Sequence, residues 1–287
     1  MDGFLIIDKP YGITSRDVVN KISKIYHTKK VGHSGTLDPI ATGVLVICVN
    51  RATKLAELVT GYDKEYIATF EFGTLTDTLD ITGNILKSED CRLDKEDLLR
   101  CLENRTCEYD QEVPIYSAVK VNGKKLYEYA REGENISLPK HRVNIKSIEL
   151  IDIKYIDNKT IVKIKCEVSK GTYIRSLGND IAEDLGTYAT MTSLIRTRQG
   201  NFDIKDAINL DLVSENLGMI DIMTILKEYK TVSVSSKLEN QISNGMVLNN
   251  EFNANTIFFV NSNGNPLALY KEYEKDSSKL KPWKTFY

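Results

Sequence analysis

The chain lacks the features that would place it in a membrane or outside the cell. Its 287 residues contain no apolar run of the roughly 18 or more residues that a membrane-spanning helix needs. The first residues, MDGFLIIDKPYG, lack the basic start, the apolar stretch and the small-residue cleavage site of a secretory signal. Fixed-period repeats and low-complexity tracts are also missing. We therefore expect an ordinary globular protein of the cytoplasm, with no membrane contact.

Cysteine is scarce, and its spacing matches no known framework. The five cysteines are odd in number and include no CxxC pair. We therefore expect neither a disulfide framework nor a zinc site. The cysteines are Cys48, Cys91, Cys101, Cys107 and Cys166.

The chain has little net charge, −2 at pH 7, which is unusual for a protein that binds nucleic acid. This average hides a segregation of charge. Residues 9–33 hold six lysines and arginines against one acid, residues 117–142 hold six against three acids, and residues 63–112 hold fourteen acids against six bases. Such a distribution allows a basic face that binds phosphates, although chance clustering on solvated surfaces would give the same counts.

Hydrophobic periodicity predicts a mixed α+β body followed by a small β-rich tail. We expect the body to span residues 1–228 and the tail residues 229–287, where short apolar segments alternate with Asn, Gly and Ser. The expected strands are residues 4–7, 44–49, 66–72, 143–155, 161–168, 257–260 and 267–270, and the expected helices begin at Thr14 or Ser15, at Asp94 and near Ile174.

Residues 31–43 predict a long structured loop, because they contain three glycines and a proline. Glycine permits positive φ or a close approach of the backbone, and Pro39 biases Asp38 towards an extended conformation. A carboxylate fixed in this way can serve as a nucleophile, a general base or a metal ligand. Because Asp-Pro pairs also occur in ordinary turns, local chemistry leaves these four interpretations open.

The segment GHSGTLDPIATGVL, residues 32–45, is similar to the active-site motif of the TruB family of tRNA pseudouridine synthases. Further segments match this family in the same order along the chain, which makes the resemblance far more specific than one motif. These segments are IDKPYGITS (7–15), ATK (52–54), DKEY (63–66), DTLDITG (77–83), PIYSAVK (114–120) with Gly123, Tyr127, Ala130 and Arg131, SKGTYIR (169–175) and residues 194–200.

The resemblance implies a pseudouridine synthase fold, which is α+β with a mixed, mainly antiparallel central sheet and flanking helices. A small β-rich C-terminal domain, similar to the PUA domains that bind RNA, would follow. The implied reaction detaches uracil from its ribose at N1 and rejoins it through C5, without a cofactor, a metal or an energy source. The usual target of the family is uridine 55 in the T-arm of tRNA, so tRNA is the expected partner. A compact chain without long basic tails is expected to act as a monomer that needs no protein partner.

The same resemblance implies a role for each matching residue. Asp38 would be the catalytic nucleophile, which either adds to C6 of the base or assists the loss of uracil at C1′. Tyr66 would stack on the base or move a proton, and Arg175 would keep the carboxylate ionised. Tyr173 would line the pocket, and Leu194 would press on the base. By themselves, Tyr66 and Leu194 are typical of a core, and Arg175 of a surface ion pair.

His33 corresponds to the family's histidine that fills the gap left by the target base. A uridine in a folded tRNA loop must be flipped out before it can react, and a flat ring in the vacated stack offsets part of that free-energy cost. His27 and His141 show no ligand spacing with His33, so we expect no metal there. For Lys9 two roles remain open, namely contact with RNA and support of the loop.

Three positions depart from the family pattern. Asn50 replaces a glycine, and asparagine also tolerates the left-handed region. Val113 replaces a proline. Ile195 replaces an arginine, which removes one candidate RNA contact.

Other functions remain compatible with the residues. The basic residues within 117–142 alternate with tyrosines, as contact with a tRNA arm requires, and we expect tRNA affinity to fall as salt rises. A non-catalytic tRNA-binding or RNA-folding module would have the same feature. A nucleoside glycosidase would instead release free uracil. A metal site at Asp77 and Asp80 is a further alternative, although their spacing does not match a calcium loop and fits a structured acidic turn.

Overall fold

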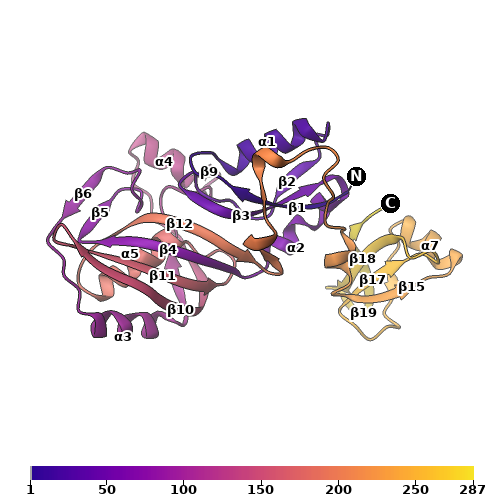
Figure 1. The fold of residues 1–287 in the computed structure, drawn as a ribbon. Helices are drawn as coiled ribbons and strands as arrows, with labels where there is room; N and C mark the ends of the chain where they lie inside the picture. Colours follow the sequence, from indigo (N-terminus) through magenta and orange to yellow (C-terminus); the bar gives the residue numbers. More distant parts are fainter. Residues whose placement is uncertain (1) are drawn as a thin grey trace.

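The computed structural model describes residues 2–287 and contains a large body and a smaller C-terminal unit (Figure 1). A ten-stranded sheet forms the body, and a five-stranded sheet forms the C-terminal unit. Within the described chain, no helix is long and apolar enough to cross a membrane. The expected α+β class with a β-rich C-terminal unit is confirmed.

The ten-stranded sheet of the body combines strands from the N-terminal and the C-terminal parts of the body. Its strands are β1 (Gly3–Lys9), β2 (Val31–His33), β3 (Ala41–Val49), β4 (Lys64–Phe72), β7 (Glu108–Glu112), β10 (Lys140–Ile156), β11 (Lys159–Val168), β12 (Ala189–Gln199), β13 (Phe202–Asp203) and β14 (Ile208–Asn209). The order is β14-β1-β3-β12-β4-β11-β10-β7, with β2 beside β3 and β13 beside β12. The β1–β14 and β3–β12 pairs are parallel and the remaining pairs are antiparallel. The central sheet is therefore mixed and mainly antiparallel, as expected.

Helices begin where the sequence supplies capping residues. The body contains α1 (Ser15–Ile25), α2 (Ala56–Thr60), α3 (Lys95–Arg105), α4 (Leu126–Glu132), α5 (Ile174–Asp184), α6 (Met223–Leu226) and the 3-10 turns η1 (Asn50–Leu55), η2 (Ile204–Asp206) and η3 (Leu210–Leu212). Thr14 and Asp17 form a reciprocal capping box at the start of α1. Asp94 accepts hydrogen bonds from two backbone N–H groups of the first turn of α3. Both expected helix starts are confirmed.

The expected strand pattern of residues 66–72 is also confirmed. Residues along β4 alternate between buried and half-buried positions, as the period of a strand with one covered face requires. The pair predicted from residues 143–155 and 161–168 forms the antiparallel strands β10 and β11.

The expected loop at residues 31–43 is shorter in the structure. Residues 31–33 form β2 and residues 41–43 belong to β3, so irregular backbone remains only at residues 34–40. The expectation was wrong at both ends because residues 31–33 pair with residues 47–49 of β3, and residues 41–43 pair with residues 194–196 of β12. These strand pairs satisfy the hydrogen bonds of backbone groups that we expected, from the glycine content, to lie in a loop.

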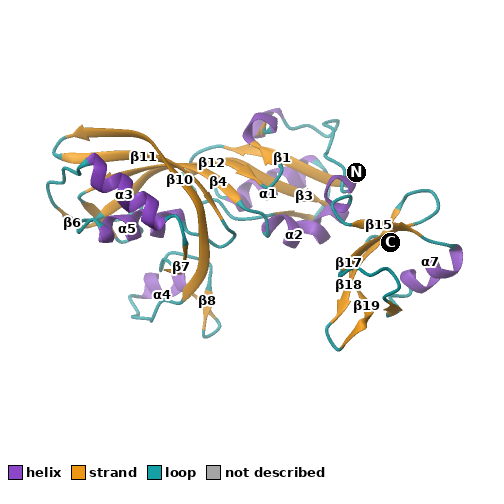
Figure 2. Cartoon of the chain, turned by 90° about the horizontal axis from the view of Figure 1, so that it is seen from below, coloured by secondary structure: helices purple, strands orange, loops and turns teal. Residues whose placement is uncertain are grey.

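Residues 113–139 connect β7 to β10 and form what we call the arm. The arm contains the two-stranded ladder of β8 (Lys120–Val121) and β9 (Lys124–Lys125), followed by α4. In Figure 2, β8 and α4 lie beyond the sheet, on the side of β7. A second small ladder, β5 (Thr74–Thr76) with β6 (Ile85–Ser88), closes the acidic turn between them.

The C-terminal unit packs against the body through a shared core. It contains β15 (Lys230–Ser233), α7 (Ser236–Ser243), β16 (Leu248–Asn249), β17 (Thr256–Val260), β18 (Pro266–Tyr273) and β19 (Asp276–Thr285). Phe258 and Phe286 belong to the same buried cluster as Val44 and Val46 of β3. The expected β-rich tail is therefore joined to the body by apolar contacts, which the sequence pattern did not predict.

Candidate active site

A cavity of about 420 Å³ opens where the 34–40 loop meets the centre of the sheet. Its walls come from the loop, β4, β12, the arm and the start of α5. Five of the seven residues singled out from the sequence line it, namely Asp38, Tyr66, Tyr173, Arg175 and Leu194. Cavities of this volume accept small organic ligands.

Asp38 and Arg175 form an ion pair at this cavity. Arg175 Nε lies 3.0 Å from Asp38 Oδ2, and the side chains are 6% and 37% exposed, respectively. The carboxylate is therefore accessible while its partner is buried. The other nitrogens of the guanidinium donate to backbone, with Nη1 2.9 Å from the Thr78 oxygen and Nη2 3.0 Å from the Tyr116 oxygen. A guanidinium fixed by the backbone of two other segments holds the carboxylate in one place.

Asp80 stands on the other side of this guanidinium, and the sequence did not assign it this position. Its Oδ2 lies 3.9 Å from Arg175 Nη1, and both side chains are 6% exposed. Asp80 Oδ1 accepts hydrogen bonds from the backbone N–H and hydroxyl of Thr82 and from the hydroxyl of Thr78. These bonds make a structured acidic turn, and no cluster of three metal-ligating side chains occurs within the described residues.

Buried polar side chains hold the loop that carries Asp38. Ser15 Oγ donates to the Leu37 oxygen at 3.1 Å and accepts from the Leu37 N–H at 2.9 Å. Arg196, which is 1% exposed, donates to the oxygens of Val44 and Gly35. The φ angles of Gly35 and Gly43 are +106° and +93°, so the expected use of glycine at positive φ is confirmed at both positions.

Lys9 supports the loop in this structure. Its side chain is completely buried, and its Nζ donates to the backbone oxygens of Pro10, Ile13 and Pro39. Burial lowers the pKa of the Lys9 ammonium to about 8, an effect that the charge of Asp38 opposes and that of Arg196 strengthens. Of the two roles that the sequence left open, these contacts are those of loop support, and no surface of Lys9 is exposed to RNA.

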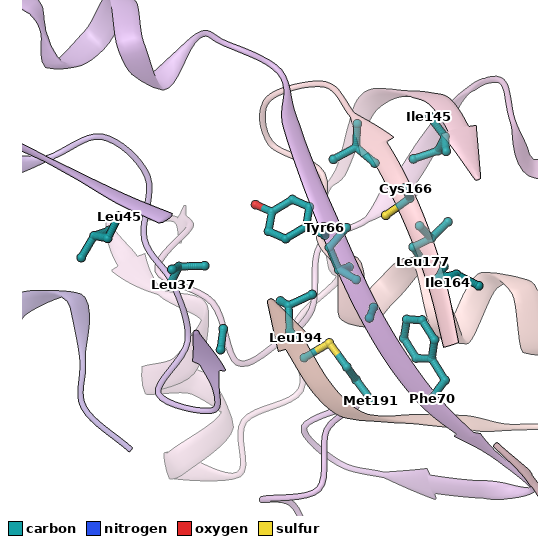
Figure 3. Close-up of a cluster of buried hydrophobic side chains, with 14 of the residues drawn as sticks. Leu37, Leu45, Tyr66, Phe70, Ile145, Ile164, Cys166, Leu177, Met191 and Leu194 are labelled. Atoms are coloured by element: carbon teal, nitrogen blue, oxygen red, sulfur yellow. The ribbon is translucent and has the colours of Figure 1, made fainter. Parts of the chain in front are cut away.

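Apolar and aromatic side chains make the walls next to the carboxylate. Tyr66 is 7% exposed and Leu194 is 6% exposed. Figure 3 shows the Tyr66 ring extending from β4 towards Leu37, with Leu194 close by and Phe70 farther along the same strand. Tyr173 stands immediately before α5, and its backbone N–H donates to Gln111 Oε1 at 2.8 Å. Burial raises the pKa of its hydroxyl.

His33 lies at the end of β2, directly before the loop, and is not among the residues that line the cavity. The ring is half-buried, and its Nδ1 has no hydrogen-bond partner within residues 2–287. Burial, together with the charges of Arg16 and Arg196, lowers the pKa of His33 below its ordinary value. The ring is therefore neutral near pH 7.

The cavity is also lined by three buried polar side chains that the sequence reasoning did not single out, namely Lys64, Ser117 and Arg196. Lys64 Nζ donates to the oxygens of Thr60 and Tyr62 at 2.6 Å each, and burial lowers its pKa to about 8. The position of Arg196 directly after the apolar pair Leu194 and Ile195 was the available signal for its burial. The sequence offered no comparable signal for the burial of Lys64 or Ser117.

The chain is similar in sequence to a family of known proteins. The model of the "TruB family pseudouridylate synthase (N terminal domain)" matches residues 23–174. The tRNA pseudouridine synthase B of Caldicellulosiruptor saccharolyticus is 44% identical over 268 residues, which are 93% of this chain and 84% of that protein. The protein of the same name from Bacillus cytotoxicus is 38% identical over 297 residues, covering 99% of this chain and 97% of that protein. The one from Fusobacterium nucleatum is 47% identical over 205 residues, or 71% and 70%.

Two solved structures share the fold. An H/ACA RNP bound to a substrate RNA containing 2′-deoxyuridine has a chain with a TM-score of 0.70 and 21% identity, and the match covers 99% of this chain and 85% of that one. A Cbf5-Nop10-Gar1 complex has one with a TM-score of 0.69 and 22% identity, covering 94% and 78%. At these identities the likeness concerns the fold alone, and it agrees with the fold that the sequence implied.

Proposed function

Because this chain belongs to the TruB family of tRNA pseudouridine synthases, which are isomerases, we propose that it converts uridine 55 in the T-arm of tRNA to pseudouridine with Asp38 as the nucleophile. The observation that carries the proposal is the Asp38–Arg175 pair at the cavity. This pair supplies an accessible carboxylate next to a buried guanidinium. A carboxylate of this kind is the group that a covalent route requires.

The proposed reaction exchanges one bond for another. The bond from N1 of uracil to C1′ of ribose breaks, a bond from C5 to C1′ forms, C5 loses its proton and N1 gains one. The atoms therefore balance without a co-reactant. Asp38 either adds to C6 of the base or stabilises C1′ while the base is detached. Arg175 keeps the carboxylate in place in both routes.

The cavity walls support the handling of a flipped base. Tyr66 and Leu194 enclose the space beside Asp38, and the Tyr66 ring offers a surface for stacking. Extrusion of a stacked base is unfavourable by a few kcal/mol. We propose that the neutral ring of His33 fills the vacated place in the RNA stack, because an uncharged ring stacks without losing the hydration of a cation.

We further propose that residues 1–228 form the catalytic domain and residues 229–287 a PUA-like domain that binds RNA. The arm, with Lys120 and Arg131, would contact phosphates of the T-arm. The chain would act as a monomer in the cytoplasm, without a protein partner. The compactness of the chain supports action as a monomer without a protein partner.

The experiment is the mapping of pseudouridine in an unmodified tRNA transcript after incubation with the purified protein. The proposal expects one product at uridine 55 and no free uracil. Product at another position would contradict the T-arm assignment. Released uracil would instead identify a glycosidase. Tight binding with no product would favour the non-catalytic tRNA-binding module.

A further inference from the structure

The start of α5 carries two residues of the cavity, Tyr173 and Arg175, but it has no cap of its own. Tyr173 is the N-cap residue, and its side chain makes no capping hydrogen bond. Arg175 belongs to the first turn. The first N–H groups of a helix have no partner within the helix. The position of both side chains therefore depends on groups outside α5.

Gln111 of β7 supplies one of these groups. The residue is 1% exposed, and its Oε1 accepts from the Tyr173 N–H at 2.8 Å. In a capping box, a Glu or Gln in the first turn of the helix makes this bond. Ser176 occupies that position in α5, and its Oγ donates to the Glu112 oxygen at 2.9 Å instead. Two adjacent residues of β7 therefore hold the first turn of α5.

A buried chain of hydrogen bonds fixes the orientation of the Gln111 amide. Its Nε2 donates to Tyr109 Oη at 2.9 Å, and the Tyr109 hydroxyl donates to Asp180 Oδ2 at 2.6 Å. Arg105 lies over the Tyr109 ring and donates to the Asp180 backbone oxygen. Because the phenol gives its only proton to Asp180, the amide must turn its NH₂ group towards Tyr109 and its oxygen towards Tyr173.

The reacting carboxylate and this chain of hydrogen bonds meet only through α5. Arg175 Nε lies 3.0 Å from Asp38 Oδ2, and Tyr173 lines the cavity. Neither Tyr109 nor Gln111 is among the residues that line it. Any effect of Gln111 on the reaction must therefore pass through the start of the helix.

We propose that Gln111 is a positioning residue for the reaction: by accepting the Tyr173 N–H it fixes the start of α5, and this places Arg175 against Asp38 and Tyr173 against the base. The inference rests on the proposed function, in which Asp38 reacts with a flipped uridine. It adds a residue of β7, outside the cavity, to the machinery that the family resemblance implied.

The first test is Gln111→Met, which keeps the length of the side chain and removes the acceptor. Single-turnover kinetics at saturating tRNA should show a rate constant lower by about tenfold to a hundredfold, because the reacting groups are displaced. Pseudouridine at any position and released uracil are both counted as product. The tRNA dissociation constant should stay within about twofold of the wild type.

Thr160→Val separates this effect from a general loss of stability. Thr160 is completely buried, and its Oγ1 accepts from the Leu93 N–H at 3.0 Å and donates to the Cys91 oxygen at 2.9 Å. The residue does not line the cavity. Like Gln111→Met, this change leaves a buried backbone N–H without its acceptor, so both variants should have a lower thermal midpoint. Only Gln111→Met should be slow.

The second test reverses the chain of hydrogen bonds. Gln111→Glu keeps an acceptor for the Tyr173 N–H but puts a second carboxylate where Nε2 lies 3.4 Å from Asp180 Oδ2. Burial already raises the pKa of Asp180, so two negative charges there are unfavourable and this variant should be slow. Adding Asp180→Asn lets the new amide donate to Tyr109 and the phenol donate to the glutamate. The double variant should recover to within about threefold of the wild-type rate.

Four results would overturn the inference. They are a wild-type rate in Gln111→Met, a loss confined to tRNA affinity, an equal loss of rate in Thr160→Val, and no recovery in the double variant. The recovery decides the question if Gln111→Met does not fold. The wild type alone tests the proposed function. Released uracil, or product away from uridine 55, would refute that function and leave the comparison of variants intact.

Discussion

Asp80 is a single residue that contacts the partner of Asp38, the proposed nucleophile. One carboxylate oxygen holds the acidic turn through Thr78 and Thr82. The other lies 3.9 Å from the guanidinium of Arg175, which in turn contacts Asp38. A buried arginine between two carboxylates has its orientation fixed from both sides. Asp80 therefore acts on Asp38 through Arg175.

Replacing Asp80 with Asn tests this arrangement. The amide can still accept the turn hydrogen bonds through its oxygen, but it no longer attracts the guanidinium. We expect the rate of pseudouridine formation to fall by on the order of tenfold or more, with tRNA affinity nearly unchanged. Asp77→Asn, in the same turn, is the matched control. Equal rates for Asp80→Asn and the wild type, measured at saturating tRNA, would show that Arg175 needs no second partner.

His33 makes the stability of the free protein depend on pH. Its pKa is lowered from the ordinary 6.5 in the folded chain, so below pH 6.5 the unfolded chain binds a proton that the folded chain resists. The free energy of unfolding should therefore fall as the pH is lowered from 7 to 5, and more in the wild type than in His33→Gln. Denaturant titrations at both pH values measure this difference. Identical pH dependence of the free energy of unfolding in the wild type and in His33→Gln would refute the assignment.

At the scale of elements, the packing of β3 against β12 depends on Gly43. An added Cβ would overlap the backbone oxygen of Arg196, and the φ of +93° is itself unfavourable for other residues. Gly43→Ala should lower the free energy of unfolding by about 3 kcal/mol or more. Gly12→Ala has a similar φ of +87° but open space around the added atom, so its loss should be only about 1 kcal/mol. Chemical denaturation measures the free energy of unfolding of both variants. Equal losses in Gly43→Ala and Gly12→Ala would mean that β12 shifts to accept the methyl group.

The elements of the body were predictable where a local signal fixes them. The capping residues Thr14 and Asp94 locate two helix starts, and alternation locates β4. Asn50 adopts a φ of +52°, as its replacement of glycine implied. Residues 31–33 and 41–43 were assigned to a loop because their pairing, with β3 and with β12 respectively, is a tertiary event that local composition does not report.

The site was predictable only as far as the family resemblance reached. Local chemistry selected the Asp38 loop, while nothing in the spacing placed Tyr66 or Arg175 beside it, because β4 and α5 meet the loop only in the folded sheet. The same limit explains why Arg196 was missed and why the role of Lys9 stayed open. Arg196 donates to backbone oxygens of distant segments, and Lys9 donates to the Pro39 oxygen, 30 residues away, as well as to local ones.

At the scale of the whole molecule, the C-terminal unit and the body share a buried apolar cluster. Phe258, Leu269 and Phe286 share a buried cluster with residues of β3. Arg51 and Lys54 donate to the backbone oxygens of Phe286 and Thr285. Removing the unit would uncover apolar surface on the body.

A chain ending at Glu228 should therefore have a lower Tm than the full chain, together with increased binding of a hydrophobic dye. Scanning calorimetry and dye fluorescence measure the two effects. Lys284→Gln removes the ion pair with Glu57 and the contact of the ammonium with the Trp283 ring but leaves the apolar cluster in place, so its effect on the Tm should be small by comparison. An unchanged Tm in the truncated chain would mean that the unit is a tethered domain, independent of the body.

The central test is the replacement of Asp38 by Asn, which preserves shape and removes the nucleophile. Pseudouridine formed in a single turnover on unmodified tRNA should fall by about three orders of magnitude or more, while the tRNA dissociation constant stays within about threefold. Asp211→Asn, at a carboxylate whose side chain is 84% exposed, should react like the wild type. Product formation by Asp38→Asn at the wild-type rate would contradict the assignment of Asp38 as the nucleophile.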